Sequence, residues 1–123
     1  MSYLLDTNTV IDFANRLLSK TAVVTIAHQS SISFITRIEL LAWPHLNALD
    51  KIVYEKFISA AYVYSCEESI ILKTIEIRKQ YKLKLPDAFI AATALVNNLT
   101  LLTRNLKDFK NIASLSAIDP HTL

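Results

Sequence analysis

Hydrophobic residues follow two alternating patterns along this chain. Short apolar runs, typical of buried strands, occupy residues 3–5, 31–35, 61–64, 99–103 and 115–118. Between them, apolar residues recur at helical spacing, which predicts helices over residues 8–18, 36–43, 50–60, 66–81 and 87–97 and a short helix after residue 105. Strands that alternate with helices predict an α/β fold, in which a mostly parallel central sheet is sandwiched between helical layers. At 123 residues, the chain is expected to form one domain, residues 1–123.

Several local patterns refine these elements. Thr36 to Glu39 and Ser65 to Glu68 match the capping boxes T-x-x-E and S-x-x-E, which predict that two helices begin there. Thr7 or Asn8 is expected to cap the first helix. Asp12 and Arg16, four residues apart in that helix, are expected to form an exposed ion pair. Residues 21–27 are rich in β-branched residues, which favours a strand, but a segment of this length also allows a short helix.

The composition excludes several classes of site. The chain contains no glycine, so it has neither a P-loop nor a glycine-rich dinucleotide-binding turn. Turns that need a positive φ must use other residues, and Asn98, Asn105 and Asn111 are the expected ones. The net charge of +2 is too small to indicate nucleic-acid binding by itself.

The same data bear on location. No apolar run approaches the roughly 20 residues of a membrane span, and the N-terminus lacks the basic and apolar regions of a signal peptide. The one cysteine, Cys66, cannot form an internal disulfide. These features predict a cytoplasmic protein that does not associate with membranes.

Four acidic residues stand at places where chemistry is common. Asp6 and Asp108 follow buried strands, and Glu39 and Asp87 are expected in the first turns of helices. In a parallel sheet, the carboxyl ends of the strands and the following helix N-termini share one edge, so all four acids could meet there. Carboxylates that meet repel one another unless a cation lies between them, and Mg²⁺ prefers such oxygen ligands. The chemistry served by this arrangement is metal-assisted hydrolysis of a phosphodiester.

A structural role remains open for two of these acids. Asp6 could accept hydrogen bonds from the amides of its own turn, as Asp residues often do. Glu39 could close the capping box with the backbone amide of Thr36.

Four segments resemble the PIN-domain ribonucleases, and within them the VapC-like toxins of type II toxin–antitoxin pairs. They occur in the family's order between residues 3 and 109, and they are Leu4-Leu5-Asp6-Thr7-Asn8, Ile35-Thr36-Arg37-Ile38-Glu39-Leu40, Leu85-Pro86-Asp87-Ala88-Phe89-Ile90-Ala91-Ala92 and Leu101-Leu102-Thr103-Arg104-Asn105-Leu106-Lys107-Asp108-Phe109. The resemblance implies a PIN-like α/β/α sandwich, and a short helix over residues 21–27.

The resemblance also assigns site residues. It implies that Asp6, Glu39 and Asp87 hold one or two Mg²⁺ or Mn²⁺ ions. Many members have an acid at the position of Asn105, and here Asp108 is the expected substitute, with Asn105 as a further polar group. Either Asp87 or Asp108 could act as the base.

The remaining implications concern smaller polar residues, RNA and partner proteins. The family's small polar residues correspond to Thr7, Asn8 and Thr103, whose structural alternative is capping and turn formation. The cations that flank the acids and could hold RNA phosphates are Arg37, Lys84, Arg104 and Lys107. The resemblance further implies an RNA substrate, a cognate antitoxin and a toxin homodimer.

Two other functions compete with the nuclease. An inert PIN-like binding module would be expected to have lost site acids, and at least three remain, so this alternative ranks second. Residues 6–10 partly match the D-x-D-x-T/V opening of haloacid-dehalogenase-type phosphatases, where the first Asp is the nucleophile. The second acid of that motif is replaced by Asn8, which places the phosphatase well below the nuclease.

Overall fold

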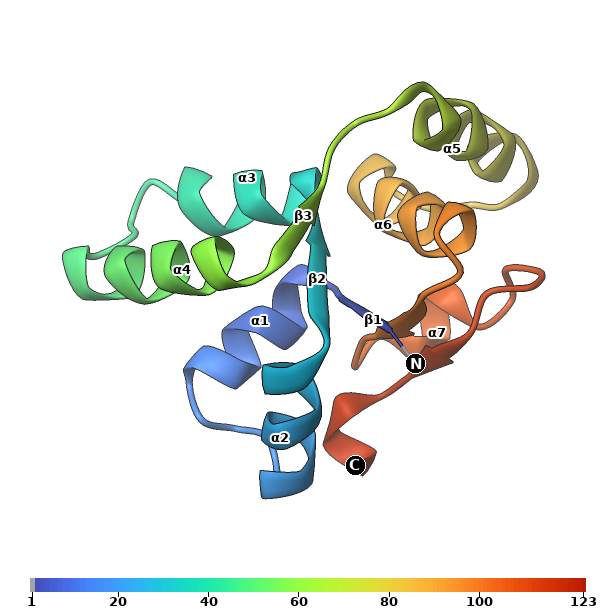
Figure 1. Cartoon of the computed structure of the whole chain (residues 1–123). Coiled ribbons are helices and arrows are strands. Elements are labelled where there is room, and N and C mark those ends of the chain that lie inside the picture. The colour runs from blue at the N-terminus through green and yellow to red at the C-terminus, as the bar shows by residue number, and fades with distance from the viewer. Residues whose placement is uncertain (1) are drawn as a thin grey trace.

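The structure, a computed structural model, describes residues 2–123 and contains one five-stranded sheet (Figure 1). The strand order is β3-β2-β1-β4-β5, and all four neighbouring pairs are parallel. The strands are β1 (Tyr3–Leu5), β2 (Ser30–Ser33), β3 (Tyr62–Tyr64), β4 (Thr100–Leu102) and β5 (Ala117–Ile118). The predicted α/β fold with a parallel central sheet is confirmed.

Helices connect the strands and cover both faces of the sheet. They are α1 (Thr7–Ala14), α2 (Lys20–His28), α3 (Phe34–Ala42), α4 (Ala48–Ala60), α5 (Glu68–Gln80), α6 (Leu85–Val96) and α7 (Leu106–Phe109), followed by a 3₁₀ turn, η1 (Pro120–Thr122). Figure 1 shows α1, α2 and α4 on one side of the sheet and α5, α6 and α7 on the other. These layers form an α/β/α sandwich.

Two hydrophobic cores lie on the two faces of the sheet because successive strand residues point to opposite sides. Leu4 and Leu101 pack with α5, α6 and α7, whereas Leu5 and Leu102 pack with residues of α1, α2 and α3. All four leucines are fully buried. Helix α6 is buried through an alanine-rich surface, which lets it pack closely against its neighbours.

The register of the strands places their carboxyl ends side by side. Leu5, the last residue of β1, is paired with Ile32 of β2 and with Leu102 of β4. The backbone N–H of Asp6 donates a hydrogen bond to the carbonyl of Leu102 (3.2 Å), which continues the pairing by one residue. The residues that follow these strands therefore start from one edge of the sheet, as the sequence predicted.

Some element boundaries differ from the predicted ones. The second strand ends at Ser33 rather than Ile35, because the Ser33 side chain accepts a hydrogen bond from the Ile35 N–H and begins α3. Helix α5 begins at Glu68 and has no side-chain cap, so the predicted capping box at Ser65 is wrong. The ambiguous segment 21–27 is helical, within α2.

The chain has no glycine, so other residues adopt positive φ where the backbone turns. Within residues 2–123 these are Arg16 (59°), Asn98 (53°) and Ser114 (67°). The prediction for Asn98 is confirmed, and those for Asn105 and Asn111 are wrong. Arg16 in the left-handed region lies just beyond α1, which ends at Ala14 instead of residue 18.

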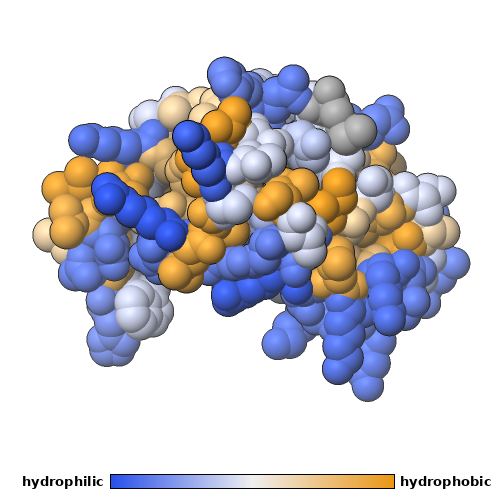
Figure 2. Space-filling model, turned by 90° about the horizontal axis from the view of Figure 1, so that it is seen from below, coloured by the Kyte–Doolittle hydropathy of each residue, from blue (hydrophilic) through white to orange (hydrophobic). Residues whose placement is uncertain are grey.

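The molecular surface carries hydrophobic groups among the charged ones. Figure 2 shows hydrophobic patches interspersed with hydrophilic side chains on one face. Large exposed residues of α3, α4 and the connection between them include Ile38, Trp43, Leu49 and Ile52. Within residues 2–123, no helix has both the length and the apolar character that crossing a membrane requires.

Candidate active site

Asp6 lies at the carboxyl end of β1, where the chain enters α1. Its Oδ1 accepts a hydrogen bond from the backbone N–H of Thr9 (2.9 Å), so Asp6, and not the predicted Thr7 or Asn8, is the N-cap of α1. Its Oδ2 accepts a 2.5 Å hydrogen bond from the Thr103 hydroxyl. Asp6 is 6% exposed, and this burial raises the pKa of its carboxyl despite both hydrogen bonds. The capping role is real, and it holds a buried carboxyl at the edge of the sheet.

Thr103 connects Asp6 to the segment that follows β4. The Thr103 hydroxyl accepts a hydrogen bond from the backbone N–H of Asn105 (3.0 Å). The Asn105 side-chain amide in turn donates to Oδ2 of Asp108 (2.7 Å). Asn105 and Asp108, the two residues considered for the fourth acidic position, therefore lie together in one hydrogen-bonded chain that begins at Asp6.

Glu39 lies in the second turn of α3 and not in its first turn, so the predicted capping box with Thr36 is wrong. The helix begins earlier, at Phe34, and Thr36 is buried inside it. The Glu39 side chain accepts a 2.6 Å hydrogen bond from the hydroxyl of Thr7, which also hydrogen-bonds to the Thr36 hydroxyl (3.1 Å). Because the capping position is filled by Ser33, the Glu39 carboxylate is left to face α1 and the Asp6 region.

Asp87 lies in the first turn of α6, as predicted, and is half-buried. Burial is the main cause of a raised pKa at this carboxyl, and the charges of Asp6, Glu39 and Asp108 raise it further. The nearby ammonium of Lys84 acts in the opposite direction. The four predicted acids come from four different elements, and the pKa of Asp87 responds to the other three.

The chemistry of these ligands fits a hard divalent cation, although the carboxylates are not yet arranged around one. Three of the four are engaged with hydroxyl or amide donors, and among residues 2–123 no three acidic, histidine or cysteine side chains form a ready ligand set. Carboxylate oxygens are the ligands that Mg²⁺ prefers, and a cation relieves the repulsion among neighbouring acids. The residues that could hold it, once their side chains turn toward a shared ion, are Asp6, Glu39, Asp87 and Asp108.

Arg104, two residues after the end of β4, is held by a residue whose role the sequence did not predict. Its Nη1 lies 3.2 and 3.3 Å from the two carboxylate oxygens of Asp12. His121, in the C-terminal turn, approaches Oδ2 of Asp12 at 2.8 Å. Asp12 is 2% exposed, and the predicted exposed pair between Asp12 and Arg16 is therefore wrong. Burial raises the pKa of Asp6, and the positive charge of Arg104 opposes part of that rise, which places this cluster beside the acids.

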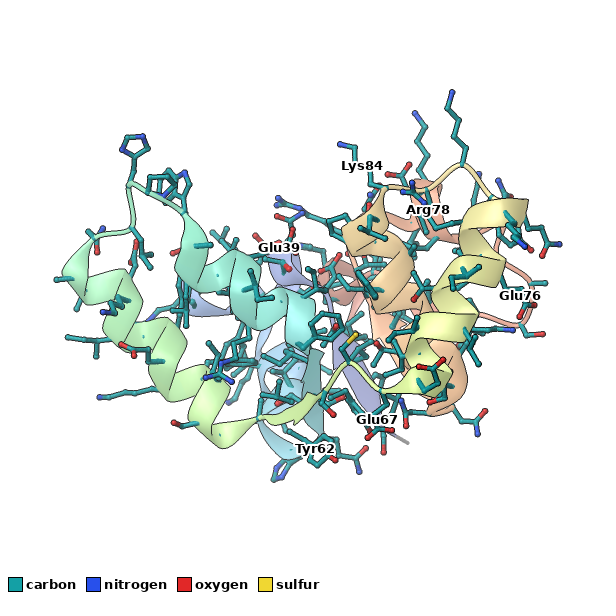
Figure 3. All side chains as sticks on the ribbon, turned by 90° about the horizontal axis from the view of Figure 1, so that it is seen from above. Glu39, Tyr62, Glu67, Glu76, Arg78 and Lys84 are labelled. Atoms are coloured by element: carbon teal, nitrogen blue, oxygen red, sulfur yellow. The ribbon has the colours of Figure 1, made fainter. Side chains whose placement is uncertain are left out.

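The other predicted cations differ in their proximity to the acids. Lys84 is the N-cap residue of α6 and lies near Asp87, while Arg37 and Lys107 are exposed on α3 and α7. Figure 3 shows Glu39, Lys84 and Arg78 toward one edge of the molecule, with Tyr62 and Glu67 toward the opposite edge.

The structure adds two cations to this group that were not predicted from the sequence. An open cleft beside the acids is lined by Arg78, Lys82, Leu83, Lys84, Asp87 and Asp108. Arg78 and Lys82 shortly precede the Leu85–Asp87 segment in the sequence, and that position was an available signal for their proximity to the acids.

Comparison with known proteins identifies the family. The family model described as PIN domain matches residues 3–115. This chain belongs to the PIN domain family. The assignment confirms the resemblance found in the sequence and favours the nuclease over the haloacid-dehalogenase alternative. No curated protein matches the chain significantly.

Solved structures with the same fold come from toxin–antitoxin complexes. A chain of a toxin–antitoxin complex from Klebsiella pneumoniae is 31% identical, with 97% of this chain and 98% of that chain covered and a TM-score of 0.73. A chain of DNA-bound VapBC from Salmonella typhimurium is 26% identical, with the same coverage and a TM-score of 0.83. A chain of VapBC-1 from nontypeable Haemophilus influenzae is 28% identical, again with the same coverage and a TM-score of 0.80. These matches support a VapC-like member of the PIN family.

Proposed function

We propose that this chain is a ribonuclease toxin of a type II toxin–antitoxin pair, and that it hydrolyses RNA internally with Mg²⁺ or Mn²⁺. Membership of the PIN domain family and the likeness to chains of VapBC complexes support the nuclease and the toxin. The observation that carries the proposal is geometric: Asp6 is linked to Asp108 through the hydrogen bonds of Thr103 and Asn105, and Asp108 lines one cleft with Asp87.

The protein's own contribution to this reaction is to hold the acids in place. Asp6, Glu39, Asp87 and Asp108 would hold one or two ions. When bound, a divalent cation supplies Lewis-acid activation of the scissile phosphate and of the attacking water. The hydrogen bonds of Thr103 and Thr7 restrict the orientations of Asp6 and Glu39 at this edge of the sheet. Asn8, exposed in the first turn of α1, and Asn105 are the remaining polar groups of the proposed site.

RNA phosphates would be held by cations that surround the acids. Arg104 is the best positioned of these, because Asp12 fixes its guanidinium while about half of the side chain stays exposed. Lys84, Arg37 and Lys107 are exposed and would add less directional attraction.

Partner proteins are part of the proposal. The relative from Klebsiella pneumoniae belongs to a toxin–antitoxin complex, and we propose that this chain likewise binds a cognate antitoxin and forms a homodimer. The exposed hydrophobic residues of α3 and α4 offer contact area for such interfaces. We also propose a cytoplasmic location, which the free cysteine Cys66 supports.

The deciding experiment is cleavage of a mixed RNA pool by the wild type and by Asp6→Asn, in Mg²⁺, in Mn²⁺ and in EDTA. Glu55→Gln, which removes an exposed acid of α4, is the matched control. We expect metal-dependent cuts with the wild type and the control and none with Asp6→Asn. Absence of cutting by a wild-type preparation that contains no copurified protein would instead support the inert binding module.

A further inference from the structure

The buried carboxylate of Asp12 connects a cation beside the acids to the C-terminal turn η1. Its two oxygens lie 3.2 and 3.3 Å from Nη1 of Arg104, and its Oδ2 lies 2.8 Å from Nε2 of His121. Arg104 and His121 are both partly exposed, whereas Asp12 is not. One buried anion is therefore shared by two basic side chains that reach it from the surface.

The contact between Asp12 and Arg104 does not by itself fix the guanidinium group. A carboxylate orients a guanidinium best when two N–H groups meet its two oxygens in parallel. Here one nitrogen, Nη1, faces both oxygens of Asp12, and both distances are at the long end of the hydrogen-bond range. The carboxylate can turn about its last bond in such a contact, and the guanidinium can follow it. A second partner on Asp12 is needed to hold the arrangement.

His121 supplies this second partner. A carboxylate only accepts hydrogen bonds, so Nε2 of His121 must carry the hydrogen that it donates to Oδ2 of Asp12. At 2.8 Å this contact is shorter than either contact of Asp12 with Arg104. With Oδ2 held by His121, the carboxylate cannot turn freely, and Oδ1 keeps its direction toward Arg104.

The turn that carries His121 is held by bonds that do not involve Asp12. The backbone N–H of His121 donates to Oδ1 of Asp119 (2.9 Å), and the Thr122 hydroxyl donates to the Asp119 carbonyl (2.7 Å). The Leu123 carbonyl accepts a hydrogen bond from the Ser19 hydroxyl (2.6 Å). Loss of the His121 imidazole should therefore leave the turn in place, so its effect on Arg104 can be measured separately.

Arg104 directly follows Thr103, whose hydroxyl donates to Asp6, and this places the guanidinium next to the proposed metal site. We propose that His121 is a positioning residue, which acts through the Asp12 carboxylate to hold Arg104 in the orientation that receives an RNA phosphate. This inference rests on the proposed function, and it adds a residue that contacts neither the RNA nor the metal.

The size of the effect follows from the cost of ordering a long side chain. Immobilising one such side chain at the moment of binding weakens affinity by about two- to tenfold. A guanidinium that is already held by the fold avoids this loss. His121→Phe keeps a ring but removes the N–H donor, so it should weaken RNA binding by about two- to tenfold. His121→Gln places an amide N–H at a similar reach and should recover most of the affinity.

The first experiment observes the Arg104 guanidinium directly by nitrogen-15 NMR, without RNA. Rotation about the Nε–Cζ bond averages the two Nη signals of a free guanidinium, whereas a held one gives separate signals. The Arg104 signals are assigned by their absence from Arg104→Met. We expect separate signals in the wild type and in His121→Gln, and averaged signals in His121→Phe. Thr122→Val, which removes a hydrogen bond of the same turn without contacting Asp12, is the matched control and should resemble the wild type.

The second experiment measures the affinity for a short single-stranded RNA in an Asp6→Asn background that prevents cleavage. His121→Phe is compared in the presence of Arg104 and in Arg104→Met. With Arg104 replaced, His121→Phe should cause no further loss of affinity, because no guanidinium remains to be held. A purely structural role of His121 would not depend on Arg104 in this way. Thermal unfolding of each variant shows that the compared proteins are folded.

The results separate this inference from the proposed function. Averaged Arg104 signals in His121→Phe, their recovery in His121→Gln and a loss of RNA affinity that requires Arg104 would together support the positioning role. Unchanged Arg104 signals in His121→Phe would overturn it. An equal loss of RNA affinity in the Arg104→Met background would also overturn it, since His121 would then act on the fold or on the RNA by itself. Failure of the wild type to cut RNA counts against the proposed function alone, because the NMR experiment uses no RNA.

Discussion

The cluster of Asp12, Arg104 and His121 allows a sharp prediction about stability, because its three members differ greatly in exposure. The Asp12 side chain is 3% exposed, whereas those of Arg104 and His121 are 49% and 37% exposed. Substitution of the anion and substitution of a cation should therefore have different costs. We compare Asp12→Asn, Arg104→Met and the double variant.

The magnitudes follow from what each substitution leaves behind. Arg104→Met leaves a buried carboxylate with only His121 at 2.8 Å. A buried charge without its partner costs about 3–5 kcal/mol, and since His121 compensates part of it we expect a loss of about 2–3 kcal/mol. Asp12→Asn leaves Arg104 and His121, which are both partly exposed and can be hydrated, so the loss should be nearer the value of an exposed pair, about 1 kcal/mol. The double variant should resemble Asp12→Asn, which gives a coupling energy of about 2–3 kcal/mol in magnitude.

Urea unfolding followed by circular dichroism measures these differences, with the slope of the transition compared among variants. A loss of 1 kcal/mol corresponds to roughly 4 °C in Tm for a chain of this length, so thermal scans provide a second measurement. Glu55→Gln on α4, which removes an exposed acid far from the cluster in sequence, serves as the control for loss of a negative charge. The reasoning would be refuted if Asp12→Asn cost more than Arg104→Met, or if the two losses were additive.

Three further predictions concern the acids. Thr103→Val should destabilise the protein by about 1.5–3 kcal/mol, because Asp6 loses a hydrogen bond to its charged form, and Thr103→Ser should restore most of the loss in the same urea assay. Asp87→Asn should weaken Mn²⁺ binding in calorimetry, whereas Glu55→Gln should not; equal affinities of all three proteins would count against a ligand role. Burial raises the folded-state pKa of Asp6 and Asp87 above 3.8, so in EDTA each carboxyl favours folding at low pH and loses this contribution as the pH rises through its folded-state pKa. Relative to the wild type, Asp87→Asn should therefore gain stability as the pH rises from 3.8 through the folded-state pKa of Asp87, and parallel pH profiles would contradict this.

The position of the acids was predictable because it depends on local pattern and on one property of parallel sheets. A buried apolar run directly before Asp6 marks a strand end, and the same pattern precedes Thr103. Parallel strands bring those ends to one edge whatever their order in the sheet. The approach of Asp6 and Asp108 thus required no knowledge of which strands are neighbours. Asp87 joins them because α6 runs back to the start of β4, so the helix begins at the same edge.

The start of α3 was not predictable with the same certainty, because two residues compete to cap it. Ser33 and Thr36 are both good N-cap residues, and only Thr36 has a glutamate three positions later. The strand pairing decides between them: β2 pairs with β3 through Ser33 and no further, so the chain turns there and Ser33 takes the cap. This shift of the helix start moves Glu39 out of its predicted capping role and leaves its carboxylate for the site.

The environment of Asp12 could not be read from the sequence at all. Helical periodicity puts Asp12 on the polar side of α1, and local charge spacing offers Arg16 as its partner. Helix α1 instead ends at Ala14, and Arg16 adopts a positive φ beyond it. Arg104 and His121 reach Asp12 from 92 and 109 residues away and bury it. Helical periodicity marks the residues that face the sheet, but only the packing of the last strands and the C-terminal turn can bury a charge on the opposite side.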